Sequence, residues 1–217
     1  EIPEGNLEFE LRPKKVDINE DPQSLVNKAL HNPIGTPQLK DMVTSGMKVI
    51  ILADDRTRLT PQRIIIPKVL EELNSAGVPD SQIQVLIAYG THRKMNPAEI
   101  LEKFGNEIVN RIEILHHDCL DMSNLIGKGT TSRGTKILVN KDFLDADFRI
   151  GIGGILPHHP TGWSGGAKIL LPGIAGQETV TAMHLLGATE QQLGNIETPC
   201  RQEMEDFAKS VGLHFII

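Results

Sequence analysis

The sequence predicts an α/β fold with a mostly parallel sheet flanked by helices. Short apolar stretches, typical of strands buried on both faces, alternate with helical stretches and recur every roughly 25 to 35 residues. Hydrophobic residues make up 39% of the 217 positions, enough for a substantial core. The expected strands cover residues 48–53, 84–88, 112–116, 137–139, 148–152 and 213–217.

Helix signals lie between these stretches. Asn96, with Glu99 three positions later, forms a capping-box pattern, and Thr60 precedes a proline suited to a first helical turn. Pro67 is expected to bend the helix in which it lies. The expected helices cover residues 24–30, about 60–76, from 96 onward and 177–186, and another is expected to begin after Gly165. Residues 1 to about 25 are expected to form an irregular arm or an edge strand.

Composition excludes several classes of function. A formal charge of −6, with no cluster of Lys or Arg, argues against nucleic-acid binding, and 4% aromatic residues offer few stacking platforms. No apolar run reaches the ~18 residues needed to span a membrane. Cys119 and Cys200 form no CxxC pair, so we expect two free thiols and a reducing, cytoplasmic compartment.

Polar clusters follow two of the expected strands, at the edge where parallel α/β sheets bind ligands. In the first cluster, Arg58 could grip a phosphate or carboxylate and Asp55 could orient it; the alternative is a salt-bridged surface turn. In the second, His92 follows a glycine and could act as a general base. For His92 alone, a structural histidine satisfied by hydrogen bonds is the commoner case.

The densest feature is a glycine-rich segment over residues 151–173, GIGGILPHHPTGWSGGAKILLPG. Gly165-Gly166 could offer backbone N–H groups to an anion. Apolar residues follow Lys168, so its amine could be partly desolvated and act as a nucleophile. The alternative is a glycine-rich loop with a solvated lysine. A lone His184 is more often structural than a metal ligand, and the pair His116-His117 is interpreted as structural.

Together these motifs resemble the N-terminal domain of the nickel-dependent lactate racemase family, the nickel-pincer nucleotide 2-hydroxy-acid racemases and epimerases. The resemblance covers roughly residues 20 to 215. Ten residues separate His158 from Lys168, and sixteen separate Lys168 from His184, as in the family. The matching motifs are Asp55-x-x-Arg58, Gly90-Thr91-His92-Arg93, Pro157-His158, Gly165-Gly166-Ala167-Lys168 and His184.

The resemblance implies that residues 1–217 form one Rossmann-like cofactor-binding domain, whose C-terminal partner domain is absent from the chain. The implied cofactor is a nickel-pincer nucleotide, Ni(II)-pyridinium-3,5-bisthiocarboxylic acid mononucleotide. Lys168 matches the residue that tethers it, and His184 matches the protein ligand of nickel. The segment that contacts the cofactor matches Asp55, Arg56, Thr57 and Arg58.

The implied reaction is racemisation or epimerisation of a small 2-hydroxy acid by reversible hydride transfer to the cofactor. His92 and His158 match the acid/base pair, and histidines with pKa values near ~6.5 can take and return protons at neutral pH. The particular hydroxy acid is left open, and its choice is expected to depend on Tyr89, His159, Thr161 and Trp163. We expect this domain alone to show little or no turnover.

Two other functions remain open from the residues alone. The first is a non-catalytic α/β module that binds a nucleotide or sugar phosphate through Arg58 and the Gly165-Gly166 loop. The second is a metal-dependent hydrolase that uses His158 and His159. It ranks last because the sequence has no matching carboxylate cluster.

Overall fold

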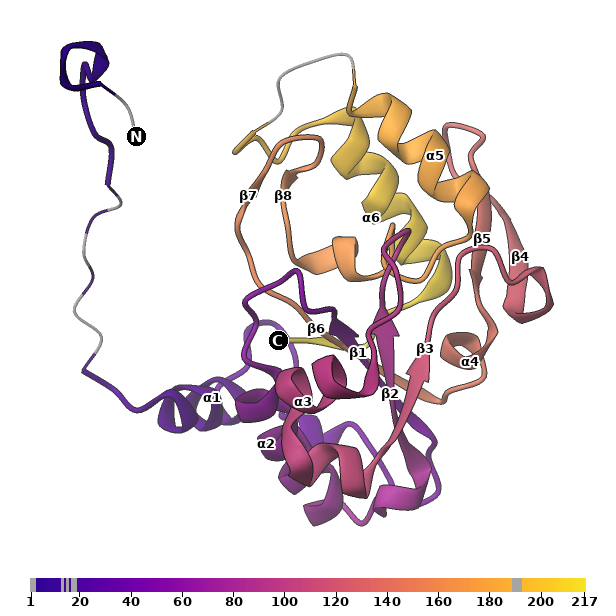
Figure 1. The fold of residues 1–217 in the computed structure, drawn as a ribbon. Coiled ribbons are helices and arrows are strands. Elements are labelled where there is room, and N and C mark those ends of the chain that lie inside the picture. The colour runs from indigo at the N-terminus through magenta and orange to yellow at the C-terminus, as the bar shows by residue number, and fades with distance from the viewer. Residues whose placement is uncertain (1–2, 13, 15, 17–18, 189–192) are drawn as a thin grey trace.

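The computed structural model describes residues 3–12, 14, 16, 19–188 and 193–217, and its centre is a five-stranded sheet (Figure 1). All four pairings are parallel, in the order β3-β2-β1-β6-β9. The predicted α/β class is therefore confirmed. The strands are β1 (Val49–Asp54), β2 (Ile83–Ala88), β3 (Glu113–His116), β6 (Phe148–Ile152) and β9 (Phe215–Ile216).

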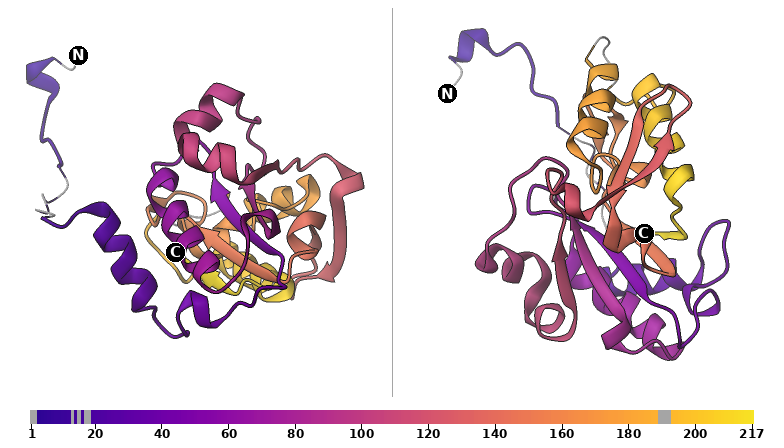
Figure 2. Two further views of the ribbon diagram at one scale, coloured as in Figure 1. Left: turned by 90° about the horizontal axis from the view of Figure 1, so that it is seen from below. Right: turned by 90° about the vertical axis from the view of Figure 1, so that its right-hand side faces the viewer.

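Helices cover both faces of the sheet (Figures 1 and 2). On one side lie α1 (Pro22–His31), α2 (Gln62–Ser75) and α3 (Pro97–Arg111), and on the other lie α5 (Gln177–Leu186) and α6 (Pro199–Val211). The short α4 (Lys141–Leu144) follows an antiparallel hairpin of β4 (Leu125–Thr130) and β5 (Lys136–Asn140). None of the helices in the described ranges is long and apolar enough to cross a membrane.

Strand β1 shows why its sequence is continuously apolar. All six of its residues are buried, since Ile51 and Ala53 pack into one hydrophobic core and Ile50 and Leu52 into the other. Neighbouring side chains on a strand point to opposite faces, so a strand covered on both faces needs apolar residues at every position. This confirms the strand expected over residues 48–53.

The chain order creates a crevice beside β1. From β1 the chain moves outward to β2 and β3, and it then returns to β6 on the other side of β1. In open parallel sheets, ligands bind at the carboxyl ends of strands at such a reversal. The loops that follow β1, β2 and β6 therefore converge at one place.

Local signals explain two helix starts differently. The capping box of Asn96 and Glu99 is confirmed, with each side chain bonded to the other residue's backbone N–H. Thr60 does not cap α2, because its hydroxyl donates to Asp54 instead. α2 runs through Pro67, whereas non-helical backbone angles interrupt α3 at Gly105, where φ is 81°.

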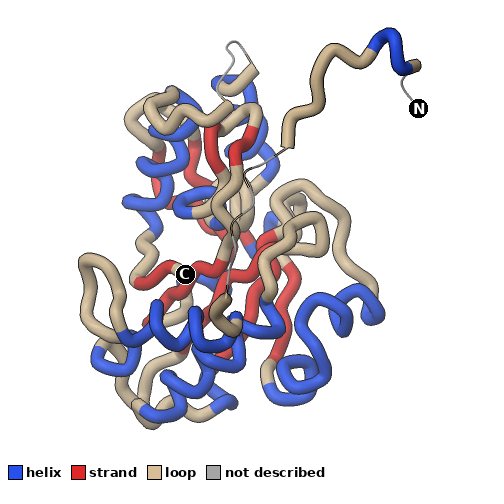
Figure 3. Tube along the Cα trace, turned by 90° about the vertical axis from the view of Figure 1, so that its left-hand side faces the viewer, coloured by secondary structure: helices blue, strands red, loops and turns tan. Residues whose placement is uncertain are grey.

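Several elements differ from expectation. The helix expected after Gly165 is one 3-10 turn, η5 (Gly166–Ile169). The described residues before α1 are irregular apart from a 3-10 turn, η1 (Glu4–Asn6) (Figure 3). Strand β4, α4, α6 and a small hairpin of β7 (Pro157–His158) and β8 (Gly162–Trp163) were not expected. The remaining 3-10 turns are η2 (Leu39–Asp41), η3 (Asp80–Gln82) and η4 (Met122–Asn124).

Candidate functional site

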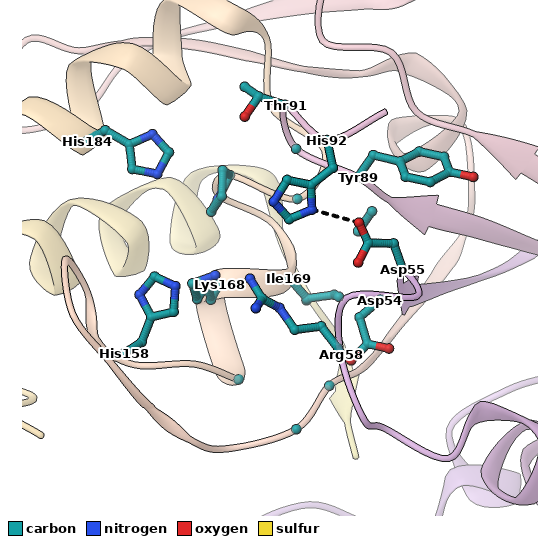
Figure 4. A pocket seen from close by; sticks show the side chains of 17 residues that line it. Asp54, Asp55, Arg58, Tyr89, Thr91, His92, His158, Lys168, Ile169 and His184 are labelled. Carbon is teal, nitrogen blue, oxygen red and sulfur yellow. Dashed lines mark hydrogen bonds and ion pairs between the residues drawn. The ribbon is translucent and has the colours of Figure 1, made fainter. Parts of the chain in front are cut away.

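A pocket opens where the loops after β1, β2 and β6 meet the glycine-rich segment and α5 (Figure 4). The structure thus brings together groups spread over 131 positions of sequence, from Asp54 to His184 (184 − 54 + 1 = 131). Glycines form much of the rest of the wall, which leaves room for a ligand close to the backbone. The polar side chains that line the pocket are Asp54, Asp55, Arg58, Thr91, His92, His158, Lys168 and His184.

His92 pairs with a buried carboxylate. Its Nδ1 lies 2.7 Å from Oδ2 of Asp55, whose other oxygen accepts bonds from the Thr57 backbone N–H at 2.9 Å and hydroxyl at 2.5 Å. Burial raises the pKa of Asp55, but the hydrogen bonds from Thr57 and His92 outweigh it and the pKa is lowered. Asp55 is therefore a carboxylate at neutral pH, which accepts the Nδ1 proton and leaves Nε2 of His92 available.

A second buried ion pair supports the same loop, and the sequence analysis missed it. Lys103, on α3, places its Nζ 2.9 Å from Oδ1 of Asp54, and both side chains are under 10% exposed (8% and 9%). The same Nζ donates to the carbonyls of Arg58 at 2.8 Å and Thr60 at 3.1 Å. All three ammonium protons are thus engaged, and the loop that carries Asp55 and Arg58 is fastened to α3. No local motif marks Lys103, since its partners lie more than 40 positions away.

Lys168 lies on η5, next to residues that pack into the core. Burial, together with the positive charge of Arg58, lowers the pKa of its amine to about 8. The expected desolvation is confirmed. An amine with such a pKa is neutral often enough near pH 7 to act as a nucleophile.

His158 lies on β7 in a different environment from His92. Its ring is half-buried, and its Nδ1 lies 3.0 Å from the Thr161 hydroxyl. Burial lowers its pKa to about 4, and the charges of Lys168 and Arg58 act in the same direction. The expectation of a pKa near the ordinary value is therefore wrong for His158, because burial and, to a smaller extent, the nearby cations disfavour a positive charge on the ring.

His184 lies on α5 at the exposed side of the pocket. Loss of solvent around the ring, with Lys168 nearby, lowers its pKa, so the ring is neutral at pH 7 and one of its nitrogens has a free lone pair. Within the described residues, no three His, Cys, Asp or Glu side chains are grouped so as to hold a metal ion.

The pocket has unbalanced positive charge. Asp54 and Asp55 already have partners in Lys103 and His92. For Arg58 and Lys168, by contrast, no side-chain hydrogen bond or ion pair is found in the described part of the chain. Two cationic side chains without carboxylates favour an anionic ligand, and a guanidinium suits phosphate or carboxylate.

Similarity to known proteins shows the family of this chain. The family model of the lactate racemase N-terminal domain matches residues 1–194. The chain belongs to this family. It is 35% identical over 199 residues to a lactate racemase of Lactiplantibacillus plantarum, with 90% of this chain and 47% of that protein covered. It is 33% identical over 225 residues to that of Thermoanaerobacterium thermosaccharolyticum, with 100% and 52% covered.

Solved structures give the same relationship. The lactate racemase apoprotein of T. thermosaccharolyticum superposes with a TM-score of 0.83 at 33% identity, over 89% of this chain and 47% of that one. A protein from Thermotoga maritima superposes with a TM-score of 0.66 at 27% identity, over 89% and 48%. The chain thus spans about half the length of the curated lactate racemases it matches.

Other residues of the family motifs support the pocket without lining it. Arg56 is exposed and pairs with Glu99 at 3.1 Å. Thr57 holds Asp55, as described above. Arg93 forms a two-pronged pair with Glu99 at 2.6 and 2.9 Å, and this pair lowers the Glu99 pKa to about 2. Of the segment 55–58, only Asp55 and Arg58 line the pocket.

The proposed substrate-selecting residues have varied positions. The Tyr89 ring points away from the pocket, and its hydroxyl lies 2.9 Å from Nδ1 of His116 (Figure 4). His159 is exposed and Thr161 is fully buried. His117 is buried and lies 3.1 Å from the Ala175 carbonyl, so both neighbouring histidines have structural partners.

Proposed function

We propose that this domain holds the cofactor and the acid/base pair of a 2-hydroxy-acid racemase or epimerase. The observation that carries the proposal is the convergence of Arg58 and Lys168, both without carboxylate partners, with His92 and His158 in one pocket. The names of its relatives support the same activity. Lactate is the first substrate to test, because both of those relatives are named for it.

The residues present fit a nickel-pincer nucleotide. Lys168 has an amine of lowered pKa suited to a covalent tether, and Arg58 suits the phosphate of a nucleotide. His184 offers a single imidazole, a donor that nickel accepts, so the other donors would come from the cofactor. When bound, this group supplies a reversible hydride acceptor, which no side chain of the domain can provide.

The two histidines move the hydroxyl proton. A racemase needs a proton acceptor for each enantiomer, because the two hydroxyl groups approach from different directions. His92 can accept a proton at Nε2 while Asp55 compensates the charge on the ring. His158 is neutral at pH 7 and can also accept a proton. In each turnover one histidine accepts the hydroxyl proton, and the other, which starts protonated, donates its proton to the carbonyl oxygen when the C–H bond is rebuilt on the opposite face. The two histidines thus exchange protonation states, and the reverse reaction restores them.

The positively charged wall binds the carboxylate end of the acid and the anionic cofactor. Since the chain spans about half of its relatives, we propose that a second domain closes the pocket and adds contacts to the substrate carboxylate. Exclusion of water would then strengthen the charge interactions in the pocket. Both cysteines are free, which fits a cytoplasmic location.

The test is covalent loading. The chain is co-produced with the cofactor-synthesis enzymes, and the peptide that contains Lys168 is analysed by mass spectrometry beside nickel analysis of the intact protein. We expect an added mass on wild type that is absent from Lys168→Arg and unchanged in Lys136→Arg, a control at an exposed lysine. A wild-type chain with neither added mass nor nickel contradicts the proposal. If such a chain still binds nucleotides through Arg58, the non-catalytic binding module is favoured.

A further inference from the structure

Thr161 is a buried residue beneath the His158 ring. It lies in the turn between β7 and β8, where His158 pairs with Gly162 across the hairpin. Its side chain is fully buried, at 0% exposure, and its hydroxyl has two neighbours at 3.0 Å: Nδ1 of His158 and the carbonyl oxygen of Trp163. The turn requires a glycine after it, since Gly162 has a φ of 74°.

The Thr161 hydroxyl has only one proton to donate, and the partner that accepts it determines the tautomer of His158. A carbonyl oxygen can only accept, so the one hydroxyl proton of Thr161 is donated to Trp163. The oxygen then has only lone pairs to offer to His158, and Nδ1 must be the donor. In a neutral ring, a proton on Nδ1 leaves Nε2 bare.

We propose that Thr161 is a positioning residue that fixes neutral His158 in the tautomer with its proton on Nδ1, so that Nε2 is the proton acceptor. This assignment deepens the proposed function and rests on it for the use of Nε2. The tautomer itself depends only on residues of this chain. Thr161 thus does for His158 what Asp55 does for His92, with a neutral hydroxyl in place of a carboxylate.

The competing explanation is that Thr161 only stabilises the turn. In that case its hydroxyl proton could point to either neighbour, and His158 would have no single tautomer. Arg201 also approaches the Trp163 carbonyl, at 3.5 Å, but a carbonyl has two lone pairs and accepts both donors. The two explanations therefore differ in the state of the His158 ring, which can be measured directly.

The first test is nitrogen NMR of the 217-residue chain, labelled at histidine and recorded at neutral pH. The His158 signals are assigned by their loss in His158→Gln. We expect wild type and Thr161→Ser to show a protonated Nδ1 and an unprotonated Nε2, and Thr161→Val to show a mixture or the opposite tautomer. A wild-type ring protonated on Nε2, or averaged between the two, overturns the proposal. The wild-type result decides it even if Thr161→Val does not fold.

The second test is kinetic and uses the full-length protein loaded with cofactor, with lactate as substrate. Thr161→Val is expected to lower kcat about tenfold with little change in KM, the scale of losing one orienting hydrogen bond, and Thr161→Ser to stay within about twofold of wild type. Equal kcat for valine and wild type overturns the positioning role. A wild type that shows the Nδ1 tautomer but no racemisation contradicts the proposed function and leaves the tautomer standing.

Discussion

The two histidines of the pocket are held in opposite ways. His92 follows β2 and is bonded to the buried Asp55 carboxylate, in a loop that an ion pair between Asp54 and Lys103 fastens to α3. His158 lies on the β7–β8 hairpin, where its side chain is bonded to the Thr161 hydroxyl and its charged neighbours are cations.

One pocket can therefore contain two proton acceptors that differ in how strongly they hold a proton. A carboxylate partner stabilises the charge that forms when His92 takes a proton. Around His158, burial and the positive charge of Arg58 oppose protonation, so its bound proton is returned readily.

The largest expected effect comes from removing either ring. His92→Gln and His158→Gln in the full-length, loaded enzyme are each expected to slow racemisation by roughly 10²–10⁴-fold, the usual contribution of a general acid or base. The measurement is the rate at which optical purity is lost, starting separately from each enantiomer. His31→Gln is the control, because His31 is exposed on α1 and does not line the pocket. A His158→Gln enzyme as fast as this control would remove His158 from the pair.

The second prediction tests the buried ion pair between Asp54 and Lys103, which holds the loop beside His92. Lys103→Met leaves the Asp54 carboxylate buried without its partner, so we expect the free energy of unfolding to fall by about 3–5 kcal/mol. Urea denaturation of the 217-residue chain measures it. Lys136→Met removes an exposed pair with Glu178 and is expected to cost less than about 1 kcal/mol. If both variants lose equal stability, the buried pair does not support the loop as described.

The smallest expected effect is a change in the pKa of His158. Lys168→Met removes a positive charge that opposes protonation, so the His158 pKa is expected to rise from about 4 but to stay below its ordinary value, since burial remains. NMR titration of the chain follows the ring, with Lys136→Met as control. An unchanged pKa would mean that the charge of Lys168 does not contribute to the shift.

The free energy of unfolding should also depend on the protonation of His158. Because the folded pKa of His158 is lowered, the unfolded chain binds more protons between about pH 4 and pH 6.5, and the free energy of unfolding falls as pH falls through this window. Lys168→Met should weaken this dependence. A stronger acid sensitivity in the variant would contradict the direction of the effect.

Much of the sheet could be predicted from sequence, since strands buried on both faces leave a continuous apolar pattern such as Ile50–Ala53. The hairpin strand β4 could not, because Gly127 and Gly129 weaken its strand pattern. Helix α6 did carry a signal, Thr198 followed by Pro199, and the Thr198 side chain caps it. The glycine-rich segment was mistaken for a helix start because a single 3-10 turn has the same local pattern.

The sequence predicted residues that line the pocket but not the residues that hold them in place. Asp55, Arg58 and His92 follow expected strands and Lys168 follows a glycine pattern, whereas the roles of His158 and His184 came from the family resemblance. All six line the pocket, and Arg56 and Thr57 do not. Lys103 and Thr161 were not assigned supporting roles, because their contacts depend on side-chain positions that no local motif encodes.

The most direct test of the account follows lactate deuterated at C2 through the full-length protein loaded with cofactor. The proposed hydride transfer predicts that optical purity is lost while deuterium stays at C2, because the hydrogen on C2 moves as hydride and not as a proton that exchanges with solvent. It also predicts that Lys168→Arg abolishes this reaction. Deuterium washed out into solvent during racemisation would contradict the hydride route, and no loss of optical purity would contradict the proposed racemase.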